Sequence, residues 1–323
     1  MVCKLISGIF TFLFVFCLFS AKAQITPETA FYWENPYYIS PASVNLDYRG
    51  YFSLSGRKQW TGLEGSPATV AATGTLFWEE YGTQAGIKVL QDRIGYVSTS
   101  DVSLSYAYSL RLAWNRFLNM GIAGAWQSQR IDRNKIRVED SDDPTFSGGR
   151  LKGVSGWNVH LGAEYVYDRS FIVGIASQNL MAFVRDKEEV WGGVNYLYAR
   201  YRTHSLLRGF DTDHYRTRSF ARSYDMEYGI CVKQYENDIQ LDGMISFYIN
   251  RETQEEKFQL SLFGRSVGEV GFLVGVKLVS DVKILCTYDY NFKAVSDNVC
   301  GTFEVMLTYP LRRTKVCRGV WDR

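Results

Sequence analysis

The chain holds three histidines, and His160 is the one whose surroundings offer catalytic chemistry. It falls in an alternating run, on the same side as the polar residues Asn158 and Glu164 and beside Gly162. A hydrolase would need a serine hydroxyl close to this imidazole, brought there from another strand. A histidine held in a polar network needs no such partner, and its neighbours are of that kind. We therefore predict that His160 is structural and that the protein is not an enzyme.

No cluster of histidines and cysteines stands at the spacing of metal ligands, so the sequence predicts no metal and no other cofactor. Asp142 and Asp143 carry carboxylates of the kind that bind Ca²⁺, but no further oxygen-ligand pattern flanks them. Pro144 follows them directly and is typical of a turn. A solvated loop is therefore the favoured interpretation of this segment.

The first residues have the pattern of a secretory signal peptide. Lys4 is a modest positive start, Leu5–Phe19 is apolar, and Ala21-Lys22-Ala23 matches a cleavage site with small residues at its first and third positions. The processed chain is therefore expected to begin at Gln24. No later window offers roughly 18 uninterrupted apolar residues, so no membrane-spanning helix is predicted.

The cysteines of the exported chain are interpreted as wall residues. Cys17 lies within the leader, and Phe16 before it is too bulky for a lipid-attachment site. An even number of cysteines in an exported protein permits disulfides. However, a symmetric link between the last two strands would set Cys286 opposite about position 304, not opposite Cys300. We favour small apolar wall positions for the four cysteines that follow the leader, which are Cys231, Cys286, Cys300 and Cys317.

Charge and composition exclude one class of function. The chain has 36 basic and 34 acidic residues, and removal of the leader lysines Lys4 and Lys22 leaves the two numbers equal. A nucleic-acid-binding protein usually shows a basic excess, so no nucleic-acid partner is expected. The 22 tyrosines and 20 phenylalanines are typical of a protein with large aromatic surfaces at a membrane interface.

The end of the chain alternates between apolar and polar residues. Three such runs are Gly271–Leu278, Val282–Tyr290 and Phe303–Tyr309. Successive side chains on a strand point to opposite faces, so each run predicts a strand with one apolar face. In the last run, Val305 and Leu307 are expected to face lipid. Glu304 and Thr308 are expected on the opposite face.

The whole chain predicts an all-β, antiparallel transmembrane barrel of the outer membrane, with about fourteen strands. Bacterial barrels have an even strand number, strands of about 9–11 residues, short periplasmic turns and longer outer loops. Long links are expected after Arg57, Gln91, Arg130, Gln178 and Phe292, and short ones after Glu79, Ala113, Asp168 and Ser280. We divide the chain into a signal peptide (1–23), an N-terminal lead-in (24–47), the barrel (48–311) and a C-terminal tail (312–323).

Several polar and aromatic segments permit two interpretations. The lead-in is irregular, and its prolines argue against a central strand. Trp60 is either an aromatic of the membrane interface, which we favour, or an anchor for a partner. The arginines between Arg208 and Arg222 either meet lipid phosphates or an acidic partner, or form a solvated face. Charges on the inner faces, among them Lys283, Asp289 and Glu304, either line a channel or form ion pairs, and pairing is favoured.

Motifs along the chain resemble those of the PorP/SprF family of the Bacteroidota type IX secretion system, over nearly all of the processed sequence. In chain order they are Arg57-x-Gln59-Trp60-x-Gly62-x-x-Gly65-x-Pro67, Asp92-x-Ile94-Gly95, Asp143-Pro144-x-Phe146, Ser177-x-Asn179-Leu180, Gly271-Phe272-Leu273-Val274-Gly275, Tyr288-Asp289-Tyr290 and Gly301-Thr302-Phe303-Glu304-Val305-Met306-Leu307-x-Tyr309. The sequence departs from the family at Ser40-Pro41, in the segment His204–Tyr224 and in the extension Leu311–Arg323.

The resemblance implies an outer-membrane barrel that works with the type IX machinery to export or anchor cargo bearing a C-terminal sorting domain, including gliding adhesins. Its implied partners are outer-membrane lipid, periplasmic secretion subunits and the cargo. An outer-membrane transporter for small, possibly hydrophobic, solutes is the alternative. Candidate partner-binding residues are Arg57, Gln59, Trp60, Gly62, Gly65, Pro67, Asp143, Pro144 and Phe146, and Phe303, Val305, Leu307 and Tyr309 are the candidate assembly signal.

The loop lengths predict the orientation of the barrel. A protease-cleavable tag inserted near Ser141 is expected to be cut on intact cells, because long loops face outward in such barrels. A tag at Asp281 is expected to be protected until the outer membrane is permeabilised. Immunoblots of protease-treated cells measure both, and the reverse pattern would invert the orientation.

Overall fold

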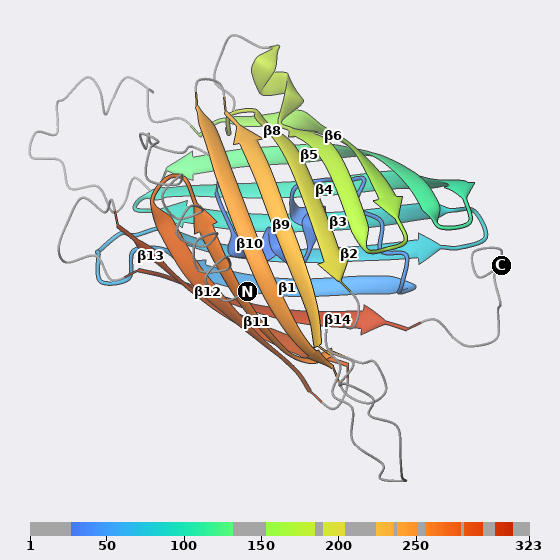
Figure 1. Cartoon of the computed structure of the whole chain (residues 1–323). Helices are drawn as coiled ribbons and strands as arrows, with labels where there is room; N and C mark the ends of the chain where they lie inside the picture. The colour runs from blue at the N-terminus through green and yellow to red at the C-terminus, as the bar shows by residue number, and fades with distance from the viewer. Residues whose placement is uncertain are drawn as a thin grey trace, which may run out of the picture.

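The computed structural model describes residues 27–131, 153–184, 190–203, 224–235, 238–250, 256–278, 281–292 and 301–312. Within them the chain forms a closed antiparallel barrel of fourteen strands, as predicted, in which each strand pairs with its neighbours in sequence and β1 pairs with β14 (Figure 1). The strands are β1 (Gly50–Lys58), β2 (Ala68–Trp78), β3 (Thr83–Ile94), β4 (Val97–Ala113), β5 (Arg116–Ile131), β6 (Ser155–Tyr167), β7 (Phe171–Gln178), β8 (Val194–Thr203), β9 (Tyr224–Gln234), β10 (Ile239–Asn250), β11 (Glu256–Arg265), β12 (Glu269–Lys277), β13 (Lys283–Asn291) and β14 (Thr302–Leu311).

The two faces of the wall divide as the alternation predicts. On β14, Leu307 is 41% exposed on the outer surface, whereas Glu304 and Thr308 are 0% and 2% exposed on the inner one. The outward rows of the other strands are likewise apolar, with exposed residues such as Leu104 and Ile175. The apolar outer face suits contact with lipid, and closure of the barrel leaves no unpaired strand edge there.

The links between strands define two ends of the barrel. The loop end carries the links 59–67, 95–96, 132–154, 179–193, 235–238, 266–268 and 292–301. The turn end carries the links 79–82, 114–115, 168–170, 204–223, 251–255 and 278–282, together with the start of β1 and the end of β14. The tight turn expected after Asp168 is present: Asp168 and Arg169 both adopt positive φ, as the central residues of a type I′ turn require, and the Ser170 N–H donates to the Tyr167 carbonyl at 3.2 Å.

One predicted loop is wrong. The segment Gln91–Thr99 was expected to be a long link, but β3 continues to Ile94 and β4 begins at Val97. Its polar residues belong to the ladder itself: Gln91 exchanges hydrogen bonds with Ser98 and Ser100 across the strand pair, at 2.7 and 2.6 Å. A two-residue turn then suffices.

The interpretation of the cysteines as wall residues without disulfides is confirmed for the two that the structure describes. Cys231 and Cys286 are free thiols, and Cys286 lies opposite Val305 in the sheet. Cys300 and Cys317 lie outside the described residues, as do the leader, the arginines 208–222 and the segment that holds Asp142 and Asp143.

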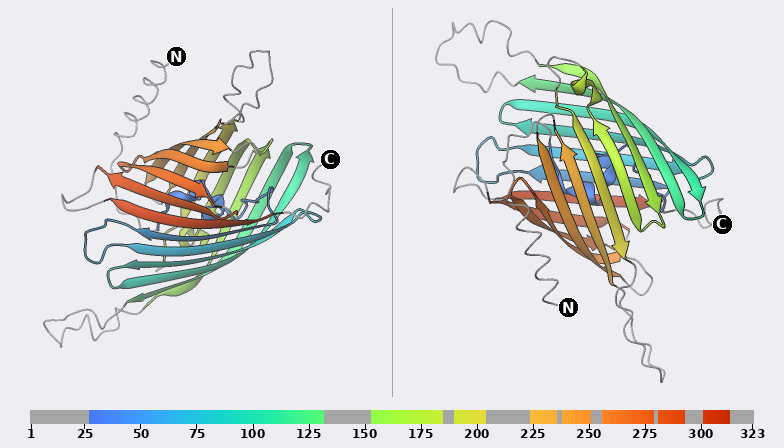
Figure 2. Two further views of the ribbon diagram at one scale, coloured as in Figure 1. Left: turned by 90° about the horizontal axis from the view of Figure 1, so that it is seen from below. Right: turned by 45° about the horizontal axis from the view of Figure 1, so that its top comes forward.

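The lead-in forms two short 3-10 helices, η1 (Ala30–Trp33) and η2 (Pro36–Tyr38), which lie inside the ring of strands (blue in Figure 2). A further one, η4 (Leu180–Phe183), follows β7. None of the helices in the described part of the chain is long and apolar enough to cross a membrane. The irregularity of the lead-in was expected from its prolines, but its place in the lumen was not.

The division of β14 into two faces can be tested with one pair of variants. Leu307→Arg places a guanidinium among lipid-facing side chains, which costs about 2–4 kcal/mol near the bilayer midplane. Thr308→Arg adds the same group on the inner face, where Thr308 borders a water-accessible cavity. We expect Leu307→Arg to lower outer-membrane yield and heat-modifiable gel migration more than Thr308→Arg. Equal tolerance of both, or the opposite order, would contradict a membrane barrel.

Candidate functional site

The lead-in crosses the lumen from one end to the other before β1 begins. At the loop end, Glu28 pairs with Lys233 near the end of β9, at 2.8 Å. At the turn end, Asp47 accepts a hydrogen bond from Arg169, at 2.7 Å. We call the segment 27–47 the plug, because it occupies the barrel axis between these two contacts.

A cluster of buried charges fixes the plug at the loop end. The Glu28 carboxylate accepts hydrogen bonds from Lys233 Nζ, Tyr235 Oη and Gln240 Nε2, at 2.8, 3.0 and 3.0 Å. Behind it, Asp242 accepts from Tyr32 Oη and pairs with Lys233, both at 2.7 Å. Acidic and basic groups alternate here, as buried charges require if each is to keep a partner.

A second contact joins the plug to the last strand. The Glu304 carboxylate on β14 accepts hydrogen bonds from Thr29 Oγ1 at 2.7 Å and from the Ala30 N–H at 3.1 Å. Its other partner is Arg57 Nη1, at 2.6 Å. We call these four residues the Glu304 clasp. Arg57, a candidate partner-binding residue, is thus 7% exposed inside the lumen and contacts the residue that holds the plug.

The other inner-face charges expected to pair also do so. Asp289 lies 3.5 Å from Arg265, and Lys283 lies 3.2 Å from Glu34 of the plug. The prediction that these groups form ion pairs is therefore confirmed.

Inward-facing glycines leave room for the plug along its path. A Cβ added to Gly121 of β5 would overlap the carbonyl group of Pro41, and one added to Gly162 of β6 would lie 2.5 Å from Ser40 Oγ. The plug backbone therefore touches the wall at a distance that only glycine allows. Two further inward glycines meet plug side chains in the same way: Gly86 faces Tyr37 and Gly229 faces Trp33.

The plug aromatics explain why the inner face is partly apolar. Phe31 and Trp33 are buried in a cluster with inward residues of β10–β14. Those wall residues include Met244, Phe263, Leu273, Leu285 and Met306. Burial of this much apolar surface stabilises the plug inside the barrel at roughly 25 cal/mol per Å² removed from water.

His160 is part of a buried polar network beneath the loop end, as predicted. It is 3% exposed, and its Nδ1 accepts the backbone N–H of Asn179 at 3.0 Å. Its Nε2 has no hydrogen-bond partner in the described part of the chain, so no serine hydroxyl from these residues is activated by it. Among the same residues no three histidine, cysteine or acidic side chains gather as a metal site.

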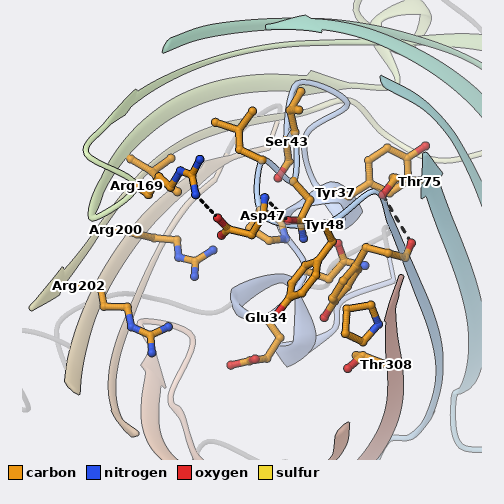
Figure 3. A pocket seen from close by; sticks show the side chains of 18 of the residues that line it. Glu34, Tyr37, Ser43, Asp47, Tyr48, Thr75, Arg169, Arg200, Arg202 and Thr308 are labelled. Atoms are coloured by element: carbon orange, nitrogen blue, oxygen red, sulfur yellow. Dashed lines mark hydrogen bonds and ion pairs between the residues drawn. The ribbon is translucent and has the colours of Figure 1, made fainter. Parts of the chain in front are cut away.

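A vestibule of about 680 Å³ lies at the turn end, between the plug and the barrel wall. Figure 3 shows Arg169, Arg200 and Arg202 along one side of it, with Glu34 of the plug and Tyr48, the residue after the plug, facing them. Its remaining lining includes Tyr37, Tyr51, Glu227, Tyr248, Lys277, Asp281, Lys283, Thr308 and Arg312.

The cations of the vestibule are each paired with an acid. Arg200 makes a two-pronged contact with Glu227, at 2.8 and 2.6 Å, which fixes the guanidinium plane. Arg202 pairs with Asp225 at 3.2 Å and stacks over Tyr248, 4.1 Å from the ring centre. The wall therefore presents oriented, balanced charges and tyrosine faces, a surface suited to a polar protein segment.

The rim of the vestibule includes a charged contact between two parts of the wall. Asp281, in the link after β12, is paired with Arg312, just beyond β14, and with Lys277. The hydrogen bond from Arg312 and the charge of Lys277 hold the pKa of Asp281 below its usual range. Asp281 thus stays ionised under ordinary conditions and joins the residue that follows β14 to the link between β12 and β13.

The motif that follows Arg57 forms the link between β1 and β2 at the loop end. Gly62 and Gly65 adopt positive φ, and Trp60 does so as well. The Gly65 carbonyl accepts the N–H of Gly95, at 2.8 Å, and Thr69 donates to Asp92, at 2.6 Å. The motif from Arg57 to Pro67 and the motif from Asp92 to Gly95 are therefore joined in one structural unit.

The remaining candidate residues fall into three places. Gln59 and Pro67 bridge the base of the same link, since the Gln59 N–H donates to the Pro67 carbonyl at 3.0 Å. Asp143, Pro144 and Phe146 lie outside the described residues. The candidate assembly signal, namely Phe303, Val305, Leu307 and Tyr309, forms the outward row of β14.

The family model of the type IX secretion system membrane protein PorP/SprF matches residues 21–309. Among solved structures, the chain is similar to the outer membrane protein Omp33 of Acinetobacter baumannii, at 9% identity over 83% of this chain and 100% of that one, with a TM-score of 0.44. CdiB from Acinetobacter baumannii matches at 9% identity over 81% of this chain and 60% of its own, with a TM-score of 0.45. The NanC porin matches at 11% identity over 81% and 100%, with a TM-score of 0.33. No curated protein matches the sequence.

The fit of the plug against the wall predicts that substitution of one glycine of β5 disturbs the plug, whereas substitution of another does not. Gly121→Val puts carbon atoms where the Pro41 carbonyl lies, so the plug must shift. We expect a conducting lumen in planar bilayers or a several-fold lower yield of folded barrel. Gly124→Val is the matched control, because a Cβ at Gly124 has no neighbour within 4 Å. If the Gly121→Val barrel conducts no more than the control and is obtained in the same yield, the plug does not touch β5.

Proposed function

The chain belongs to the PorP/SprF family of type IX secretion system membrane proteins, and on that basis we propose that it supports the export or cell-surface anchoring of cargo with a C-terminal sorting domain, as for gliding adhesins. The protein lies in the outer membrane, in keeping with its apolar outer wall and closed barrel. The observation that carries the proposal beyond the family is a lumen filled by the plug, beside a vestibule at the turn end.

The orientation we propose places the turn end in the periplasm. It carries the end of β14 and five of the six links there have no more than five residues, as is typical of periplasmic turns. The vestibule would then face the periplasmic secretion subunits. A segment of one of these subunits, or of the cargo, would enter it and meet the paired arginines and tyrosines of its wall.

The volume and chemistry of the vestibule favour a protein segment over a small apolar solute. Pockets of about 300–1,000 Å³ hold ligands of the size of a few side chains. Its ion pairs, such as that of Arg200 with Glu227, offer charged hydrogen-bond partners of both signs, and the apolar part of its lining, with Val44, Leu46 and Ile172, is the smaller one. A transporter for hydrophobic solutes would need an apolar path, and the plug stands across the axis of this barrel.

The rim of the vestibule provides the variants for the test. Arg169→Glu and Arg312→Glu reverse two rim charges, whose side chains are 43% and 51% exposed, so the fold should tolerate them. In a deletion strain complemented with these variants, we expect surface cargo to fall several-fold at unchanged barrel level. Arg93→Glu, an exposed charge reversal at the loop end, is the matched control and should secrete normally.

The rival function is tested with the purified protein in liposomes. We expect no specific, saturable flux of small solutes, because the plug fills the lumen. Saturable uptake by the intact barrel, together with normal cargo secretion in the deletion strain, would overturn the secretion role and establish a transporter.

A further inference from the structure

The two ends of the described chain lie at opposite ends of the barrel. Pro27 and Glu28 border a cavity at the loop end, beside Tyr235 and Trp191. The other terminus leaves from the turn end, where the Leu311 carbonyl accepts the N–H of Arg49, at 2.9 Å. The chain therefore enters its own barrel from the side opposite to the start of β1.

We propose that the processed N-terminus is displayed at the loop end, so that the N- and C-termini of the folded protein lie on opposite sides of the outer membrane. With cleavage before Gln24, three residues precede Pro27, and three residues span at most about 11 Å. The apolar band of such barrels is about 25 Å tall. The first residue therefore cannot return to the turn end while the plug is in place.

The contacts of the plug make this position a permanent one. Glu28 is held by four groups of β9–β11 and the link beyond β9, and Glu304 holds the next two residues of the plug. Withdrawal would take the Glu28 carboxylate away from Lys233 and Arg265 and two hydrogen-bond donors away from Glu304; Lys233 would retain its pair with Asp242 and Glu304 its pair with Arg57, but all the plug contacts would be lost together.

The close fit of the plug against the wall also holds it in place. Phe31, Tyr32 and Trp33 follow one another at the centre of the lumen, all buried. The glycine contacts at Gly121 and Gly162 leave no clearance beside the backbone at Pro41 and Ser40. The folded wall therefore fits closely around the plug at these positions, which keeps the start of the plug at the loop end.

The position of the N-terminus is tested with two epitope tags in the full chain. One tag is inserted between Thr26 and Pro27, and a second is placed after Arg312 in a separate strain. We expect antibody to reach the N-terminal tag on intact cells and the C-terminal tag only after permeabilisation. Exchange of the two patterns would invert the barrel but still leave the termini on opposite sides. Accessibility of both tags from one side would overturn the proposal.

An engineered disulfide reads the plug position without any tag. A Cβ at Gly162 would lie 3.2 Å from the Ala42 Cβ, close to the separation of about 3.5–4.5 Å that a disulfide requires. In a Ser40→Ala background, which removes the hydroxyl 2.5 Å from the new Cβ, we expect Gly162→Cys with Ala42→Cys to yield the linked peptides in mass spectra of the folded, heat-modifiable protein. Gly124→Cys with Ala42→Cys is the matched control and should yield none. Folded protein without the Gly162 link would overturn the threaded arrangement.

This inference does not depend on the secretion role. The tag and disulfide experiments report the path of the chain, whereas cargo display and solute flux report what the barrel does. If the tags lie on opposite sides of the membrane, the inference about the termini is upheld. If the rim variants also secrete cargo normally, the vestibule is rejected as the docking site.

Discussion

The structure depends on the pairing of buried charge in the lumen. A barrel of this size encloses many inward side chains, and an ion removed from water is tolerated only beside a partner. Glu304 shows how the plug meets that requirement, since its carboxylate receives Arg57 of the first strand and Thr29 and Ala30 of the plug at once. The wall and the plug are therefore joined through shared ion pairs and hydrogen bonds, and these contacts hold the plug in the lumen.

The sequence predicted those features that repeat. The period of two along β12–β14 identified the strands, the lipid-facing row with Leu307 and the inward position of Glu304, and the same logic gave His160 its place in a polar network. These patterns are local and need no knowledge of which segments meet. The expected loop after Gln91 failed because its polar residues bond across a strand pair and so mimic the composition of a link.

The plug could not be predicted because nothing periodic marks it. Its aromatics suit an interface belt as well as a core, and its partners, such as Lys233 for Glu28, lie about two hundred residues away in sequence. One signal was present in the chain: Gly86, Gly121, Gly162 and Gly229 interrupt strand interiors on the inner side. Glycine within a strand often marks the close approach of another backbone, and here it records the route of the plug.

The Glu304 clasp also bears on quality control. Thr29 precedes the first strand and Glu304 lies on β14, so their contact forms only after all fourteen strands have been synthesised. A product that stops short of β14 leaves Arg57 unmatched and an open strand edge on β1, both of which periplasmic proteases and chaperones can recognise. Closure of the barrel therefore occurs only in a chain that has been synthesised through β14.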